Sequence, residues 1–207
     1  MVLIRRESLK EFLSLYPITA IIVFLNTMVI STTTMIGIFD NHFSVFQWGG
    51  ISRDGIEQGE YYRLISNAFL HGGIFHFASN MLFTILLAPY IEKLLGKFIF
   101  ILFFFAAILA TPLYEIIYTN EISVGESGFG FALFGFYLFL VLFQKECLDK
   151  DSRVSVIIFM AIGWIASFIF PHVSISGHAC GFAAGFLAAL FTKNLRKISQ
   201  INNAVPM

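Results

Sequence analysis

The chain alternates between long apolar stretches and short polar connections. A helix that crosses a bilayer needs about 20 mostly apolar residues, and six stretches approach that length, although several are short or contain glycine and polar residues. These stretches are residues 17–39, 74–91, 98–118, 127–143, 154–170 and 175–192. The pattern predicts an all-α membrane protein, a bundle of six transmembrane helices.

Polar ends flank this predicted membrane domain. We expect an N-terminal segment 1–16, one six-helix membrane domain 17–192 and a tail 193–207, without a repeat or a second domain. The first apolar stretch is longer than the core of a signal peptide, and no small-residue cleavage site accompanies it, so we expect no cleaved signal peptide.

Composition agrees with a membrane protein. The 207 residues are 57% hydrophobic and only 13% charged, with a mean hydropathy of +0.81, whereas soluble domains have about 25% charged residues. The net charge of zero gives no electrostatic footprint for nucleic acid. Cys147 lies in a charged connection and Cys180 in an apolar stretch, so we expect no disulfide between them.

Positive charge is distributed unevenly between the two sides of the bundle. With six crossings, one side holds both termini and the second and fourth connections, and it carries eleven of the thirteen Lys and Arg residues, all except Arg53 and Arg63. Lys and Arg concentrate on the cytoplasmic side of membrane proteins. We therefore expect a multi-pass protein of the plasma membrane with both termini in the cytoplasm and the first connection, residues 40–73, outside.

Polar residues occur near the outer starts of the second, fourth and sixth predicted helices. They are His71, His76, Asn80, Ser127 and His178. At 1.5 Å per residue, His76 and Ser127 lie about 25 Å above the inner ends of their helices and His178 about 22 Å. In a hydrocarbon core of about 30 Å, these side chains share one layer below the outer surface. Polar residues at such depth usually face a bundle interior or a watery cavity and mark function.

Ser127 and His178 are the candidate nucleophile and base. A serine hydroxyl needs a neighbouring base to attack a carbonyl, and histidine titrates close to neutral pH. The resulting oxyanion needs fixed donors, which Asn80 and His76 offer from one helix face, together with the backbone N–H at the helix start. No Asp or Glu in the other spans is placed to orient His178, so the sequence predicts a dyad rather than a triad.

Each of these residues also has a structural interpretation. A serine in a membrane helix often bonds the carbonyl four residues earlier, and a histidine in a bundle can be a structural hydrogen-bonding group. Gly177, Gly181 and Gly185 recur every four residues and predict a face of close helix packing. The combination of serine, histidines and asparagine at one depth on three helices favours chemistry.

Four motifs on a six-helix frame resemble those of the rhomboid family. "FLHGGIFHFASNM" resembles the family's second-helix motif, with His71, His76 and Asn80. "GESG" is similar to its Gly-x-Ser-Gly motif, and "GHACGFAAG" to its sixth-helix motif. "EYYRL" resembles the Glu-x-Trp-Arg element of the first loop, with Tyr62 in place of the tryptophan. The resemblance covers residues 25–192.

The resemblance implies an intramembrane serine endopeptidase that cleaves transmembrane segments of other membrane proteins through an acyl-enzyme. Ser127 would be the nucleophile, His178 the base, and His76 and Asn80 the oxyanion hole. Structural roles would fall to His71, Gly125, Gly128, Phe131, Gly181, Gly185 and Arg63. The resemblance implies neither a cofactor nor a metal, and its partners are membrane-protein substrates and the lipid bilayer.

The resemblance also implies neighbours for several of these residues. Phe131 is expected beside the catalytic imidazole. Gly181 and Gly185 are expected where the sixth helix closely approaches the fourth. Arg63, with Glu60, is expected to hold the first loop.

Two other functions stay open. A non-catalytic rhomboid-like protein that binds membrane clients is one, although such relatives typically lack the serine or the histidine. A transporter or metal carrier that uses the histidines is another, but cation paths usually contain acidic residues, and the spans have almost none apart from Glu115 near an end.

Glu126 departs from the family pattern, which usually has a small or apolar residue before the serine. Its carboxylate could favour the imidazolium form of His178, or it could point to water.

Overall fold

The computed structural model describes residues 3, 7–37, 47–118, 123–170 and 173–204, with side chains described as far as residue 194. Its α-helices are α1 (Leu9–Leu15), α2 (Pro17–Met35), α4 (Arg53–Glu57), α5 (Arg63–Ser66), α6 (Ile74–Leu95), α7 (Lys97–Tyr118), α8 (Ser127–Phe143), α9 (Lys150–Ile169) and α10 (Ile175–Ala204). Two short 3₁₀ turns, Asn67–Phe69 and Lys145–Cys147, complete the helical part. Within these residues, β structure is limited to an isolated antiparallel bridge between Ile51 and Ser123.

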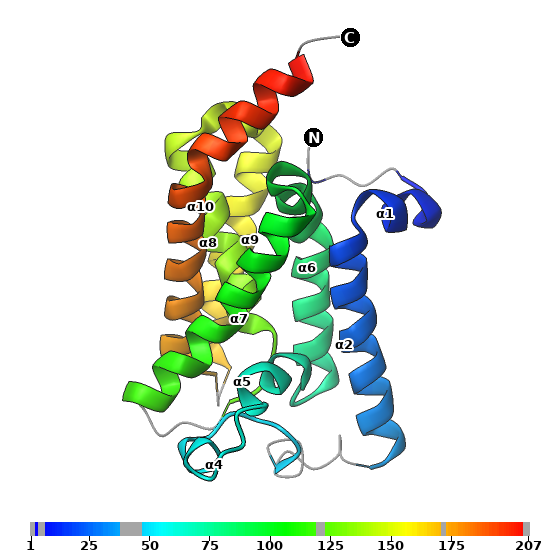
Figure 1. Ribbon diagram of the computed structural model, residues 1–207, viewed down its shortest axis with the longest axis vertical. Helices are drawn as coiled ribbons and strands as arrows, with labels where there is room; N and C mark the ends of the chain where they lie inside the picture. Colours follow the sequence, from blue (N-terminus) through cyan, green and yellow to red (C-terminus); the bar gives the residue numbers. More distant parts are fainter. Residues whose placement is uncertain (1–2, 4–6, 38–46, 119–122, 171–172, 205–207) are drawn as a thin grey trace.

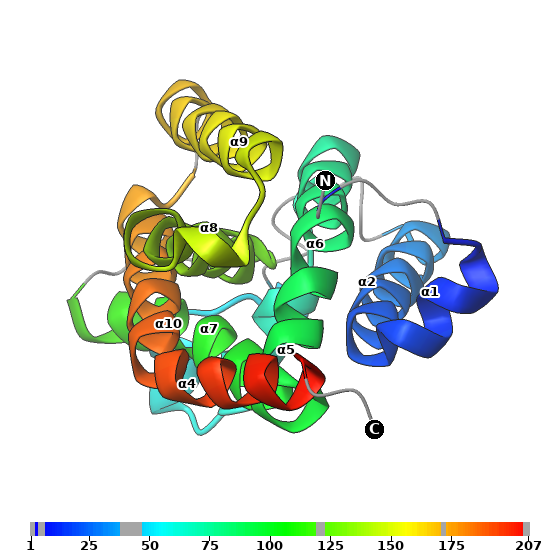
Figure 2. The same ribbon diagram turned by 90° about the horizontal axis from the view of Figure 1, so that it is seen from above.

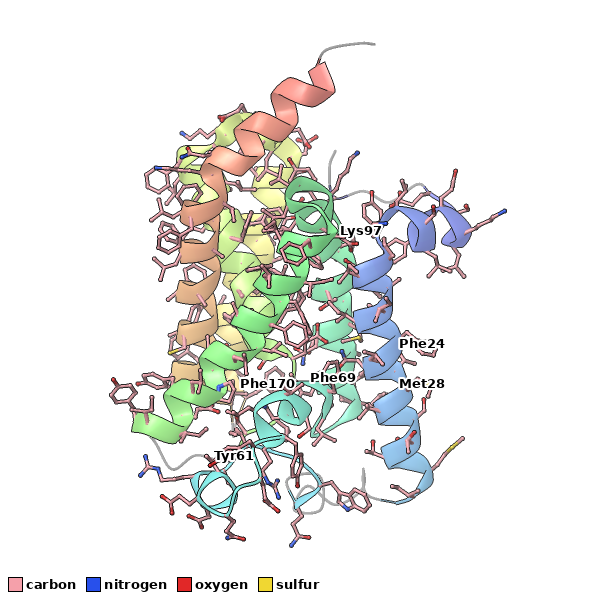
Figure 3. The ribbon with its side chains drawn as sticks, in the orientation of Figure 1. Phe24, Met28, Tyr61, Phe69, Lys97 and Phe170 are labelled. Carbon is pink, nitrogen blue, oxygen red and sulfur yellow. The ribbon has the colours of Figure 1, made fainter. Side chains whose placement is uncertain are left out.

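Five helices, α2, α6, α7, α9 and α10, are long and apolar enough to cross a membrane. The shorter α8 has 17 residues and is buried along most of its length. Outer helices present apolar side chains outward: Figure 3 shows Phe24 and Met28 directed away from the bundle, and Phe24 is 61% exposed. Such exposure is favourable only where lipid replaces water. The predicted all-α membrane bundle is therefore confirmed.

Helix ends differ in places from the predicted spans. α6 continues past residue 91 and ends where Gly96 adopts φ +75°, a usual way of closing a helix. α10 continues past residue 192 to Ala204, because no proline or glycine interrupts the residues that follow. α2 ends at Met35, and the rest of the predicted first span runs into residues 38–46, outside the described chain.

α8 occupies the centre of the bundle. It packs against α6, α7, α9 and α10, most extensively against α10. The view from above shows α6 between α8 and α2 (Figure 2). Phe129 of α8 is fully buried, with its ring 4.9 Å from that of Phe104 and 5.8 Å from that of Phe103 on α7. A helix that is apolar on all sides is stable only when surrounded, which explains why this short helix is the core.

Glycines allow α8 and α10 to approach each other at backbone distance. A Cβ added at Gly185 would lie 1.8 Å from the Ala132 carbonyl oxygen, and one added at Gly135 would lie 1.9 Å from the Phe182 carbonyl oxygen. Neither distance is possible between real atoms, so any side chain at these positions would push the helices apart. The close packing predicted from the glycine spacing on the last helix is present at Gly185.

The segment between α2 and α6 folds against one end of the bundle. α4 and α5 lie at the end where α6, α8 and α10 begin, while α2 begins and α10 ends at the opposite end (Figure 1). Arg63 donates from Nε to Glu60 at 2.6 Å and from Nη1 to the Gly50 carbonyl at 2.8 Å. Arg53 donates from Nε to the Ile116 carbonyl at 2.8 Å, which ties this segment to the last turn of α7.

Candidate active site

Ser127 is the first residue of α8 and follows a tight turn. Gly125 in that turn has φ +120°, a conformation that L-residues with a side chain rarely adopt. Its N–H donates to the Asn67 carbonyl at 2.8 Å. A Cβ at Gly125 would lie 2.5 Å from Cε1 of His76. Glycine at this position therefore lets the turn bring Ser127 close to His76 on α6.

His178 lies in the first turn of α10, and its ring is stacked on Phe131 of α8. The two ring centroids are 3.9 Å apart and the planes differ by 13°. Trp164 of α9 contacts the same phenyl ring edge-on at 4.9 Å. His178 is 8% exposed. The stack fixes the plane of the imidazole and puts Phe131 where the family resemblance expects it.

The close approach of α8 and α10 occurs directly beside Ser127 and His178. A Cβ at Gly181, one turn after His178, would lie 2.3 Å from the carbonyl oxygen of Gly128, the residue after Ser127. A Cβ at Gly128 would in turn lie 2.6 Å from Thr111 Oγ1 of α7. These two glycines let the helix starts that carry the serine and the histidine come together.

A cavity of about 110 Å³ opens among α6, α8, α9 and α10. The predicted dyad and oxyanion-hole residues all line it: Ser127, His178, His76 and Asn80. Ser79, Phe131 and Ser167 contribute to the same wall. Three helices from distant parts of the sequence thus bring four predicted polar side chains to one cavity.

No direct hydrogen bond between Ser127 Oγ and His178 is formed among the described residues. Both side chains nevertheless border the cavity. Catalytic hydrogen bonds are often long in proteins without substrate and tighten when it binds.

Asn80 contributes an unpartnered donor to the cavity wall. The residue is 6% exposed, and its Nδ2 has no hydrogen-bond acceptor among the described residues. A buried donor without a partner costs about 1–3 kcal/mol, so such a group calls for an explanation. An oxyanion bound in the cavity would supply the missing acceptor.

His71 lies outside the cavity, behind His76. Their ring centroids are 5.2 Å apart, and His71 also meets Phe77 edge-on at 5.4 Å. Burial, together with the proximity of His76, lowers the pKa of His71 to about 3. His71 is therefore neutral and packs against His76 from behind the cavity.

Ser167 of α9 is a polar neighbour of His178 that the sequence analysis did not single out. Its Oγ lies 2.8 Å from His178 Nδ1 and donates to the Gly163 carbonyl at 2.8 Å. A serine near the end of an apolar helix carries no motif, and back-bonding to residue i−4 is its ordinary structural role. One feature of the sequence was consistent with this contact: the predicted fifth helix ends on the outer side of the membrane, where the other polar residues lie.

Glu126 is 1% exposed, which excludes the alternative that its carboxylate points to water. Its Oε2 accepts a hydrogen bond from Asn26 Nδ2 of α2 at 2.5 Å, and its Oε1 accepts one from Thr84 Oγ1 of α6 at 2.8 Å. Its backbone carbonyl accepts from the N–H of Phe129 at 2.8 Å. The residue before Ser127 is thus held from α2 and α6.

Other acidic residues are also engaged in structural contacts. Glu92 of α6 accepts from the N–H of Ile18 at 2.9 Å and from the Thr19 hydroxyl at 2.7 Å, at the start of α2. Glu115 of α7 accepts from the Ser123 hydroxyl at 2.5 Å. Within the residues that the structure describes, no group of three or more His, Cys, Asp or Glu side chains is placed to hold a metal ion.

Comparison with known proteins gives consistent matches. The sequence model of the Rhomboid domain matches residues 58–194. The chain is 30% identical over 191 residues to the rhomboid relative YdcA of Bacillus subtilis, covering 89% of this chain and 92% of that protein. It is 28% identical over 149 residues to Rhomboid protease GluP of the same organism, covering 72% of this chain and 29% of that protein.

A plant protein extends these matches. The chain is 31% identical over 134 residues to RHOMBOID-like protein 1 of Arabidopsis thaliana, covering 64% of this chain and 34% of that protein. The chain therefore spans nearly all of YdcA but only about a third of GluP and of the plant protein.

Proposed function

This chain belongs to the rhomboid family of intramembrane proteases, and from that membership we propose that it is a serine endopeptidase that cleaves transmembrane segments of other membrane proteins. Ser127 is the nucleophile and His178 the general base. The observation that carries this proposal is the shared cavity, to which α8 and α10 each contribute one of the two residues at their first turns.

The proposed reaction is acyl transfer. His178 Nε2 takes the proton of Ser127 as its Oγ attacks the scissile carbonyl. The oxyanion accepts hydrogen bonds from Asn80, from His76 and from the backbone N–H at the start of α8. His178 then gives its proton to the leaving amine. A water that gives a proton to the same imidazole attacks the acyl-enzyme, and the carboxylic acid product leaves as His178 returns that proton to Ser127 Oγ. The unpartnered donor of Asn80 supports its assignment to the oxyanion hole.

The proposed substrate is a transmembrane helix that opens locally. A helical carbonyl is already hydrogen-bonded and shielded, so the segment must unwind before Ser127 can attack it. Helix-breaking residues near the cut would lower the cost of that opening. The cavity lies at the end of the bundle that carries α4 and α5, so cleavage near the corresponding end of the substrate helix is proposed.

Charge supports an orientation for this enzyme. Among the residues whose side chains the structure describes, the end opposite the cavity carries seven cationic residues: Lys10, Lys93, Lys97, Lys145, Lys150, Arg153 and Lys193. Arg53 and Arg63 lie in the segment at the cavity end. We therefore place both termini in the cytoplasm and the cavity toward the outside of the plasma membrane. In this arrangement residues 1–16 and 193–207 flank the proteolytic domain 17–192.

A non-catalytic client-binding protein is the alternative. It would need neither a nucleophile nor a base, whereas this chain has both Ser127 and His178 beside one cavity. Labelling with a serine-directed fluorophosphonate separates the two functions. Labelling of the wild-type protein that disappears in Ser127→Ala supports the protease, and a wild-type protein that is not labelled contradicts it.

A further inference from the structure

We propose that Ser167 positions His178, so that the base presents an unprotonated Nε2 to Ser127. This inference rests on the proposed function, because it assigns a role toward the same base. Ser167 does not touch the reacting atoms; it acts through the imidazole.

The Ser167 hydroxyl contacts both His178 and the backbone of its own helix. Ser167 is 4% exposed and comes from α9, which packs beside α8 and α10 (Figure 2). Its Oγ has two neighbours at hydrogen-bond distance, His178 Nδ1 and the Gly163 carbonyl oxygen, each at 2.8 Å. Both neighbours are buried with it, so each contact weighs more than it would in water.

The number of protons available to these two contacts fixes the tautomer of His178. A hydroxyl has one proton to donate, and a carbonyl oxygen can only accept. Both contacts are hydrogen bonds in one arrangement: Ser167 donates to Gly163, and Nδ1–H of His178 donates to Ser167 Oγ. The proton of a neutral imidazole then resides on Nδ1, which leaves Nε2 with a lone pair. That is the tautomer a base must have to accept the Ser127 proton.

Ser167 and Phe131 restrain the His178 ring in different ways. Stacking at 3.9 Å and 13° fixes the plane of the imidazole, but a ring turned by 180° about its Cβ–Cγ bond lies in the same plane. The turned ring would put a carbon where Nδ1 now meets Ser167 and would lose that hydrogen bond. Phe131 therefore sets the plane and Ser167 selects one of the two orientations.

The same contact acts again after proton transfer. When Nε2 has taken the Ser127 proton, the imidazolium carries positive charge on Nδ1–H, and the Ser167 oxygen accepts a charge-assisted hydrogen bond from it. Ser167 thus occupies the place that a carboxylate has in a triad, but without its negative charge. The site works as a dyad supported by a neutral third residue.

Kinetics of Ser167→Ala and Ser167→Thr test this role. We expect Ser167→Ala to lower kcat about tenfold to a hundredfold, the effect of one hydrogen bond to a charged group, with KM unchanged. Threonine keeps the hydroxyl and its bond to residue i−4, so Ser167→Thr should restore most of kcat. Ser155→Ala, the same substitution about three turns earlier on α9, is the matched control. Wild-type kcat in Ser167→Ala would overturn the proposal.

A measurement on the wild-type protein does not depend on any variant at Ser167. ¹⁵N NMR of histidine-labelled protein, with His178 assigned from the spectrum of His178→Asn, reports which ring nitrogen is protonated. We expect Nδ1–H in the wild type, and a His178 protonated on Nε2 instead would overturn the proposal. Nδ1–H in a protein that cleaves no substrate would contradict the proteolytic function and leave the contact intact.

Discussion

Asn26 Nδ2 lies 2.5 Å from Glu126 Oε2, so the first long helix holds the residue that immediately precedes Ser127. Thr84 of α6 donates to the other oxygen of the same carboxyl group at 2.8 Å. Asn26, Thr84 and Glu126 are all buried. Glu126 therefore joins α2 and α6 to the turn that begins α8, and it contacts these helices instead of water.

Removing the Glu126 side chain should loosen this junction. Glu126→Ala removes the acceptor of the buried Thr84 hydroxyl and leaves the Asn26 amide with only its bond to the Ile22 carbonyl at 3.0 Å. A buried donor without an acceptor costs about 1–3 kcal/mol, so we expect a lower unfolding temperature in detergent together with reduced cleavage. Glu126→Gln keeps one oxygen acceptor and should lose less. The exposed Glu57 of α4 supplies the control Glu57→Ala. Equal unfolding temperatures of Glu126→Ala and Glu57→Ala would show that the hydrogen bonds of Glu126 do not contribute to the stability of the fold.

Asn80 should affect the reaction rather than the fold. We expect Asn80→Ala to lower kcat by about 10²- to 10³-fold, the usual effect of losing one oxyanion donor, with the unfolding temperature nearly unchanged. Steady-state cleavage of a reconstituted transmembrane substrate measures this.

The control for Asn80 is Ser79→Ala on the same helix. Ser79 lines the same cavity, but its hydroxyl donates to the His76 carbonyl of its own helix at 2.9 Å, so its removal should leave kcat close to wild type. Similar losses in both variants would argue against an oxyanion role for Asn80.

Gly185 should be intolerant of any side chain. A Cβ there would meet the Ala132 carbonyl oxygen at 1.8 Å, so Gly185→Ala must separate α8 from α10. Overpacking of this kind costs about 1–3 kcal/mol and occasionally more, and we expect a lower unfolding temperature with loss of cleavage. Gly130→Ala on α8 is the control for stability, because a Cβ at Gly130 meets no atom within 4 Å. A Gly185→Ala protein as stable as Gly130→Ala would refute the close contact.

Chelation should leave the proposed reaction unchanged. The mechanism uses a serine and a histidine and involves no metal-bound water, so cleavage in the presence of EDTA should equal cleavage without it. Activity that EDTA abolishes and zinc restores would instead favour a metal-dependent function of His71, His76 and His178.

Hydropathy and motif spacing were sufficient for the bundle and for the cavity residues. Apolar stretches of bilayer length identify the membrane helices, and the rise per residue puts Ser127 and His178 in one layer. Both inferences use properties of single helices. For this reason they did not require knowledge of how the helices are rotated against each other.

The contacts that depend on this rotation were not predictable. Ser167 meets His178 because α9 presents that face to α10, and Asn26 meets Glu126 because α2 presents that face to the start of α8. No periodicity or motif in one sequence fixes either rotation. From the sequence alone, Ser167 resembles any serine that bonds the carbonyl four residues earlier in its helix. The neighbours of Glu126 could not be inferred.

The most direct measurement is cleavage of a single-span transmembrane substrate, with helix-breaking residues near its outer end, in liposomes that contain wild-type, Ser127→Ala or His178→Ala protein. Unfolding temperatures and membrane insertion confirm that each variant is folded. We expect cleavage by the wild-type protein and none above the enzyme-free background by either variant. Cleavage retained by a folded Ser127→Ala or His178→Ala protein would contradict the Ser127–His178 dyad.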